Sequence, residues 1–164
     1  RIILERLRLT LHPEKTRVVE LGVGKEGFVF LGCYLRIMRS HFKRREYLYR
    51  WPSPKAMNSV RQRIRELTSR RRWAWVKDIR CVIDNLNPVL RGWGNYFCTG
   101  NASPQFNVID SFVRRRLLRL MARRGGQRRA KFRDKDWPHS RFVEKLGLYR
   151  LLGTIRYPGS VHAT

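Results

Sequence analysis

Apolar positions change their spacing near residue 52 of this 164-residue chain. Before that point they come in short runs typical of strands, over residues 16–21, 28–35 and 47–51. The glycine-rich stretch 22–27 separates the first two runs, which predicts a β-hairpin. We therefore expect a small antiparallel region here, preceded by a helical segment over residues 1–9.

After residue 52 the apolar residues recur every three or four positions, which predicts amphipathic helices. A small polar residue followed by proline marks three helix starts, at Ser53, Asn87 and Ser103. A further helix is expected over 76–86, and Gly125-Gly126 ends the last one. The predicted inward stripes are Met57, Val60, Ile64 and Leu67; Ile79, Val82, Ile83 and Leu86; and Phe106, Ile109, Val113, Leu117 and Leu120.

These patterns predict an α+β fold, with a small antiparallel hairpin region followed by a mainly helical domain. We divide the chain into a β region over 1–52, a helical domain over 53–126 and a basic C-terminal extension over 127–164. Apolar residues of the extension, among them Trp137, Phe142 and Leu148, can dock it onto the helices.

The charge of the chain points to a polyanion as its partner. There are 37 Lys and Arg against 12 Asp and Glu, a net charge of +25. Between residues 85 and 133 one acidic residue, Asp110, stands among eleven basic ones. A solvated helix face normally mixes both signs, so this one-sided pattern favours nucleic-acid contact. The candidate binding residues are Arg61, Arg63, Arg65, Arg70, Arg71, Arg72, Arg115, Arg116, Arg119 and Arg123.

Other classes of site find little support in the sequence. No apolar run approaches the roughly 18 residues of a membrane-spanning helix, and no signal peptide opens the chain. The histidines are scattered, and the close pair Asp134 and Asp136 has no third ligand in view, so no metal site is predicted. Three widely spaced cysteines suggest the reducing bacterial cytoplasm.

The segment 86–97 combines Pro, Arg, Gly, Trp, Asn, Tyr and Phe in a way that a plain core helix does not require. We expect Trp93 and Phe97, one turn apart, to pack helices together. For Trp73 and Trp75 the sequence leaves both core packing and base stacking open. Glycines at 92 and 94 indicate the close approach of a neighbouring helix or of an RNA strand. Arg91 and Asn95 are the polar residues of this segment that we expect to face RNA.

Three blocks of the chain, from about Leu7 to Gly125, resemble the C-terminal part of group II intron reverse transcriptases, also called maturases. Residues 11–16, Leu-His-Pro-Glu-Lys-Thr, look like the palm segment that follows the catalytic carboxylates. Residues 28–32, Phe-Val-Phe-Leu-Gly, look like the hairpin that grips the primer strand. Residues 86–97 look like part of the thumb, or maturase-specific domain.

The resemblance implies roles for particular residues. Lys15 matches a palm lysine that acts on the departing pyrophosphate, as a candidate general acid. The residues alone are equally compatible with a surface cation in the turn. Phe30, Leu31 and Gly32 would position the primer end. The helices over 53–125 would bind group II intron RNA and the RNA/DNA template–primer.

This chain also departs from the family pattern. The Tyr-x-Asp-Asp turn that holds the catalytic metal is absent, as are the fingers and most of the palm. We therefore expect the chain to bind no cofactor, with Mg²⁺ belonging to the complete polymerase, and to polymerise nothing alone. Its first residue is Arg1 rather than Met, which we interpret as the mark of a fragment or a trimmed chain.

Two other interpretations remain open from the sequence. A stand-alone RNA-binding protein of the ribosome-associated type explains the charge but not the hairpin blocks. A helical DNA-binding module is compatible with short helices, although no recognition helix stands out.

Overall fold

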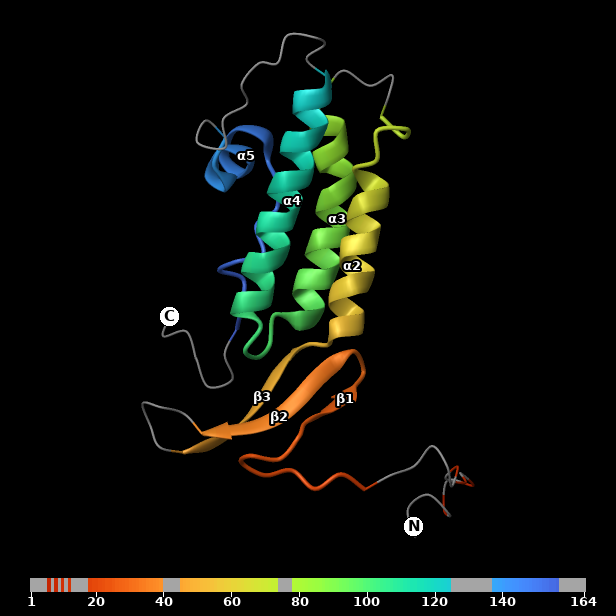
Figure 1. Cartoon of the computed structure of the whole chain (residues 1–164), viewed down its shortest axis with the longest axis vertical. Helices are drawn as coiled ribbons and strands as arrows, with labels where there is room; N and C mark the ends of the chain where they lie inside the picture. Colours follow the sequence, from red (N-terminus) through yellow and green to blue (C-terminus); the bar gives the residue numbers. More distant parts are fainter. Residues whose placement is uncertain are drawn as a thin grey trace.

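Three strands precede four helices in the part of the chain that the structure describes (Figure 1). This computed structural model describes residues 18–39, 45–73, 78–124 and 137–156, with Arg6, Arg8, Thr10 and His12. The elements are β1 (Phe28–Phe30), β2 (Cys33–Arg39), β3 (Glu46–Pro52), α2 (Pro54–Leu67), α3 (Arg80–Phe97), α4 (Ser103–Arg124) and α5 (His139–Leu146). This order confirms the predicted α+β class.

The three strands form one antiparallel sheet in the order β1-β2-β3. The single strand predicted over 28–35 is wrong, because the chain reverses at Leu31-Gly32 between paired residues Phe30 and Cys33. Both turn residues have positive φ, 47° and 75°, as a two-residue type I′ hairpin turn requires. The strand predicted over 16–21 is also wrong over its described residues 18–21, which are not paired.

Helix α2 begins as the sequence predicts. The Ser53 hydroxyl accepts a hydrogen bond from the Ala56 amide at 3.2 Å, and Pro54 occupies the first turn. Helix α4 begins at Ser103 itself, one residue earlier than a Ser103 cap would place it, and ends at Arg124.

The helix break predicted at Asn87 is wrong, because α3 runs without interruption from Arg80 to Phe97 with Pro88 inside it. Pro88 is exposed, so water can satisfy the carbonyl that loses its helical partner. The Asn87 side chain caps no helix start. It accepts from the Tyr149 amide at 2.8 Å and donates to the Gly147 carbonyl at 2.9 Å.

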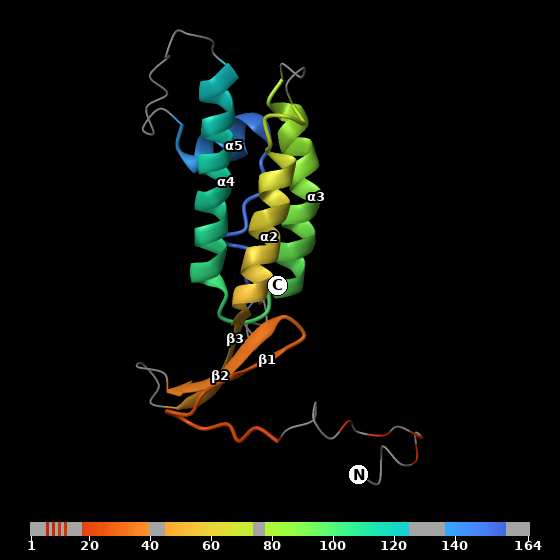
Figure 2. The ribbon, with the colours of Figure 1, turned by 45° about the vertical axis from the view of Figure 1, so that its right-hand side comes forward.

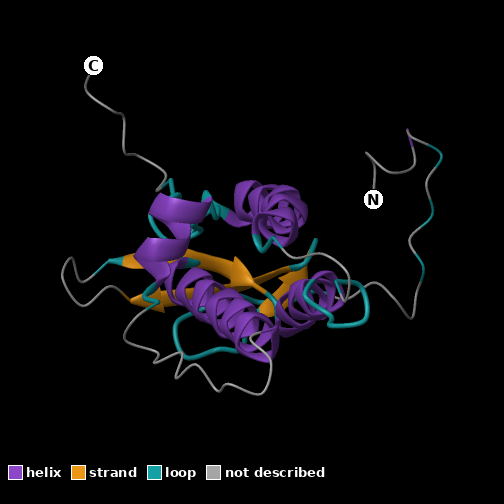
Figure 3. Cartoon of the chain, turned by 90° about the horizontal axis from the view of Figure 1, so that it is seen from above, coloured by secondary structure: helices purple, strands orange, loops and turns teal. Residues whose placement is uncertain are grey.

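Helices α2, α3 and α4 lie side by side along the long axis in an up-down-up arrangement above the sheet (Figures 1 and 2). Viewed from above, the sheet crosses beneath the helix ends (Figure 3). The predicted inward stripes are confirmed: all their members are buried except Ile79, which packs partly buried against the core. Trp73 is buried as well and donates its indole N–H to the Leu67 carbonyl, so it belongs to the core. Trp75 lies outside the described residues.

The C-terminal segment belongs to the same core. After α5 the chain returns along α3 and α4 toward the sheet (Figure 2), where the Arg156 amide donates to the Cys98 carbonyl at 2.7 Å. Phe142, Leu148 and Leu151 are fully or almost fully buried among the helices. The predicted docking of this segment is therefore confirmed.

Candidate nucleic-acid interface

Arginines of α2 and α4 gather on one side of the bundle. The Arg65 guanidinium lies over the Phe112 ring of α4, 5.5 Å from its centroid. Arg115 and Arg119 follow Phe112 by three and seven positions and share its side of α4. Arg61 stands one turn before Arg65 and is half-buried. We call Arg61, Arg65, Arg115 and Arg119 the arginine face.

Arg115 and Arg119 are available to a ligand. Both are exposed, and neither makes a hydrogen bond or ion pair with any described residue. Arg123 lies one further turn along α4, although its side chain is outside the described part. Within the arginine face, Arg115 and Arg119 therefore present positive charge that no described residue pairs with.

Arg116 has a different place from its neighbours. Its guanidinium donates to the Thr68 hydroxyl at 2.9 Å and to the carbonyls of Thr68 and Arg65 at 3.3 and 3.4 Å. These carbonyls belong to the end of α2, where a cation is favoured by the helix dipole. Arg116 thus joins α4 to the C-terminus of α2. The sequence pattern groups Arg116 with the binding arginines, because charge alone does not show which arginines of α4 face the C-terminal end of α2.

The single acid of α4, Asp110, is buried and does not neutralise the arginine face. Its carboxylate accepts from the amides of Leu151 and Leu152 at 3.1 and 2.9 Å. The carboxylate therefore holds the returning C-terminal segment against α4. The sequence signal for this role is the position of Asp110 next to Ile109 on the apolar stripe, where a carboxylate must be paired if it is buried.

His139 lies beside this carboxylate, with Nε2 3.9 Å from Asp110 Oδ1. Burial lowers the pKa of His139 below its ordinary value of 6.5. The Asp110 carboxylate acts in the opposite direction, while Arg150 and Arg114 lower this pKa further. The imidazole is therefore neutral at pH 7.

The remaining predicted residues do not join the arginine face. Arg91 lies over the Tyr149 ring at 5.3 Å, and Asn95 is exposed one turn later on the side of α3 that meets the C-terminal segment. Arg70, Arg71 and Arg72 are exposed in the loop after α2, with Arg72 over the Trp73 ring. Lys15 lies outside the described residues.

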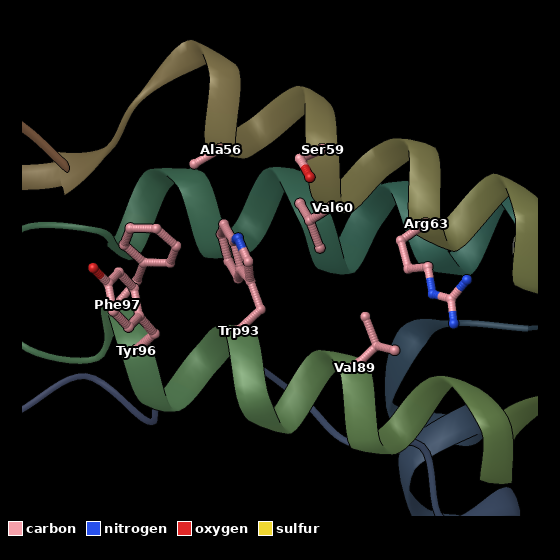
Figure 4. A pocket seen from close by; sticks show the side chains of 8 residues that line it. All are labelled: Ala56, Ser59, Val60, Arg63, Val89, Trp93, Tyr96 and Phe97. Atoms are coloured by element: carbon pink, nitrogen blue, oxygen red, sulfur yellow. The ribbon is translucent and has the colours of Figure 1, made fainter. Parts of the chain in front are cut away.

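A groove of about 350 Å³ runs between α2 and α3 (Figure 4). Val60, Val89, Trp93 and Phe97 give it an apolar lining, and Arg63, paired with Glu66 at 3.2 Å, stands at one end. The Trp93 ring lies 5.0 Å from Phe97 and 5.4 Å from Phe106, which confirms the predicted packing role of Trp93 and Phe97. The buried indole N–H of Trp93 has no hydrogen-bond partner among the described residues.

The β1–β2 turn adjoins the other end of this groove. Leu31 is 70% exposed and Phe30 is 57% exposed. The Tyr96 hydroxyl, at the rim of the groove, donates to the Leu31 carbonyl at 2.7 Å, and the Ser53 amide donates to the Gly32 carbonyl at 2.9 Å. A non-glycine residue in the left-handed region costs about 1–2 kcal/mol. Tyr96 of α3 and Ser53, the N-cap of α2, together hold the Leu31-Gly32 turn, and the Leu31 side chain remains in solvent.

Of the two glycines in segment 86–97, only Gly94 marks a close approach. A Cβ at Gly94 would lie 2.7 Å from Leu151 Cδ2, whereas a Cβ at Gly92 would meet nothing within 4 Å. The neighbour is the C-terminal segment, which is neither of the partners we expected. Gly92 lies on the exposed surface of α3.

The described ranges contain no group of three or more His, Cys, Asp or Glu residues placed to hold a metal ion. Among the described helices, none is both long enough and apolar enough to cross a membrane.

In a comparison with protein families, residues 57–137 match the family described as group II intron, maturase-specific domain. This range covers α2 from Met57 onward and all of α3 and α4. A comparison with curated proteins finds no match.

Proposed function

Because residues 57–137 belong to the maturase-specific domain family of group II introns, which implies a role in splicing, we propose that the chain acts by binding intron RNA on its arginine face. The observation that carries this proposal is the pair Arg115 and Arg119, exposed on a helix whose only acid is buried. An arginine guanidinium binds a phosphate group through two parallel N–H···O hydrogen bonds. Each phosphate that is neutralised in this way releases counterions into solution.

The β1–β2 turn supports a second contact, with the template–primer. Leu31 keeps a strained backbone and an exposed side chain at the tip of the sheet, and strain of this kind often accompanies a ligand contact. Phe30 and Gly32 complete the turn. We propose that this tip touches the primer strand while the helices hold RNA.

The chain contributes binding rather than catalysis in this proposal. The sequence lacks the Tyr-x-Asp-Asp turn with which such polymerases hold Mg²⁺. Metal-dependent extension of a primer by the purified chain would contradict this part of the proposal.

A salt series with three nucleic acids tests the binding proposal. The wild-type chain and the double variant Arg115→Ala/Arg119→Ala are titrated with a folded group II intron RNA, an unrelated structured RNA and a duplex DNA. Each lost phosphate contact lowers the slope of log affinity against log salt by about 0.7–0.9. We therefore expect the double variant to bind intron RNA more weakly, with a slope lower by about 1.5.

The matched control is Lys55→Ala/Lys145→Ala, which removes two exposed charges from α2 and α5 away from the arginine face. It should leave the slope nearly unchanged. An equal effect of both double variants would show that binding follows net charge alone. Equal binding of all three nucleic acids by the wild-type chain would favour an unspecific basic protein.

A further inference from the structure

One side of the sheet carries a row of rings that the arginine face does not include. Side chains alternate across a strand, so every second residue of β2 and β3 shares a side. The antiparallel register pairs residues on this side as Tyr34 with Trp51, Arg36 with Tyr49, and Met38 with Tyr47. We call Tyr34, Arg36, Tyr47, Tyr49 and Trp51 the aromatic face.

The aromatic face looks away from the helices. On the other side of the sheet, Cys33 is buried in the core that the helices build, and Arg50 donates from Nε to the Thr99 carbonyl at 3.0 Å. Because Tyr34 and Trp51 neighbour these two residues along their strands, their side chains point to the opposite side. The sheet lies below the bundle in Figure 1.

The face is accessible in the described structure. Tyr47 is 40% exposed, and Tyr49, Trp51 and Arg36 are partly exposed. The segment before β1 contacts this face at Tyr34, where the Gly27 amide donates to the Tyr34 hydroxyl at 3.0 Å. The Tyr34 and Trp51 rings lie 5.1 Å apart and tilted by 46°, which fixes their positions on the sheet.

The spacing of the rings suits an extended nucleic-acid strand. Alternate residues of a strand lie about 7 Å apart, roughly twice the 3.4 Å rise of stacked bases, so Tyr47, Tyr49 and Trp51 can each meet a separate unstacked base. Sheets that present aromatic residues in this way bind single-stranded RNA by stacking. Arg36, across from Tyr49, adds a cation among the rings, which suits a phosphate-linked ligand better than an apolar protein surface.

We infer that the aromatic face binds a single-stranded nucleic acid by stacking its unpaired bases on Tyr47, Tyr49 and Trp51. The inference rests on the proposed nucleic-acid function, but it assigns a different surface and a different interaction. Stacking accepts any base and does not depend on the sugar, so RNA and DNA strands share the chemistry that is recognised.

The test uses the full chain and labelled 12-nucleotide strands: oligo(rU), oligo(dT) and an abasic strand with the same number of phosphates. The variant Tyr47→Ala/Tyr49→Ala should lose about 10-fold or more in affinity for both base-containing strands. Its salt slope should stay unchanged, because no phosphate contact is lost. The variant Tyr47→Phe/Tyr49→Phe keeps the rings and should retain the affinity.

Residue Leu48 gives the matched control within the same strand. It is 55% exposed and lies on the opposite side of β3 from Tyr47 and Tyr49. Leu48→Ala should bind all strands as the wild type does. The abasic strand should bind weakly and equally to every variant.

Three results would overturn the inference: wild-type affinity in the alanine double variant, equal loss on the abasic strand, or equal loss in Leu48→Ala. A changed sedimentation coefficient with unchanged affinity would instead make the face a protein contact. Failure of the arginine face is distinguishable, because Arg115→Ala/Arg119→Ala changes the salt slope whereas the tyrosine variants do not. Since RNA and DNA strands are titrated separately, a preference for one would identify the source of the ligand.

Discussion

Replacement of Asp110 by alanine should strongly destabilise the fold. The carboxylate is almost completely buried and accepts two backbone hydrogen bonds, from Leu151 and Leu152. A hydrogen bond to a charged acceptor contributes about 1.5–3 kcal/mol to stability. Loss of both bonds therefore lowers the free energy of unfolding by about 3–6 kcal/mol, a large part of the 5–15 kcal/mol typical of a domain.

Urea unfolding monitored by circular dichroism measures this loss. The matched control is Asp84→Ala, which removes the same charge from an exposed position on α3 and should change the stability by less than about 0.5 kcal/mol. Asp110→Asn should lie between the two, because an amide keeps one acceptor oxygen but turns a donor toward a backbone N–H.

Limited proteolysis locates the effect. Detachment of the C-terminal segment should make the chain after α5 sensitive to protease in Asp110→Ala before the helices unfold. If the free energies of unfolding of Asp110→Ala and Asp84→Ala agree within about 0.5 kcal/mol, the two hydrogen bonds do not hold the C-terminal segment, and the reasoning is refuted.

Other perturbations follow from the same contacts. Arg116→Ala should lower the free energy of unfolding by about 1–2 kcal/mol, because the carbonyls at the end of α2 lose their hydrogen-bond donor. Urea titration measures this loss. A variant with wild-type stability but a lower salt slope of RNA binding would place Arg116 on the binding surface instead. Ser53→Ala should cost about 1 kcal/mol and lower Tm by about 2–4 °C in calorimetry, whereas an unchanged Tm would mean that the Ala56 amide finds another acceptor. Because burial lowers the pKa of His139, the unfolded chain takes up this proton first as pH falls. Stability should thus be complete above about pH 6.5 and decline as pH falls through the lowered pKa, and His139→Asn should remove that part of the pH dependence in urea titrations between pH 4 and 8.

The helical bundle was predictable from the sequence because burial there follows a simple period. Met57, Ile64 and Phe106 lie where the three- and four-residue spacing places them, and the Ser53 cap is a local contact that a short motif specifies. The continuous α3 was missed because Asn87-Pro88 satisfies the rule for a helix start. The partner that draws Asn87 away from that role, Tyr149, is 62 residues distant.

The candidate interface was predictable only in part. Charge counting selected the exposed Arg115 and Arg119 together with Arg116, although the hydrogen bonds of Arg116 to α2 connect positions 48 to 51 residues apart. The aromatic face could not be recognised as a surface from the sequence, because the pairing of β2 with β3 aligns Tyr34 with Trp51 and no local motif specifies that register. Local sequence specifies helix periods well, whereas long-range pairing decides which polar side chains remain for a ligand.

The bonds around the β1–β2 turn have a mechanical consequence. Only Ser53 separates β3 from α2, and the Ser53 amide is bonded to Gly32, while Tyr96 of α3 is bonded to Leu31. Arg50 of β3 is bonded in turn to Thr99, after α3. These hydrogen bonds tie the sheet to the bundle, so that the two move together as one rigid unit. A nucleic-acid strand bound at the β1–β2 turn and an RNA bound along the helices would therefore stay at a fixed distance from each other.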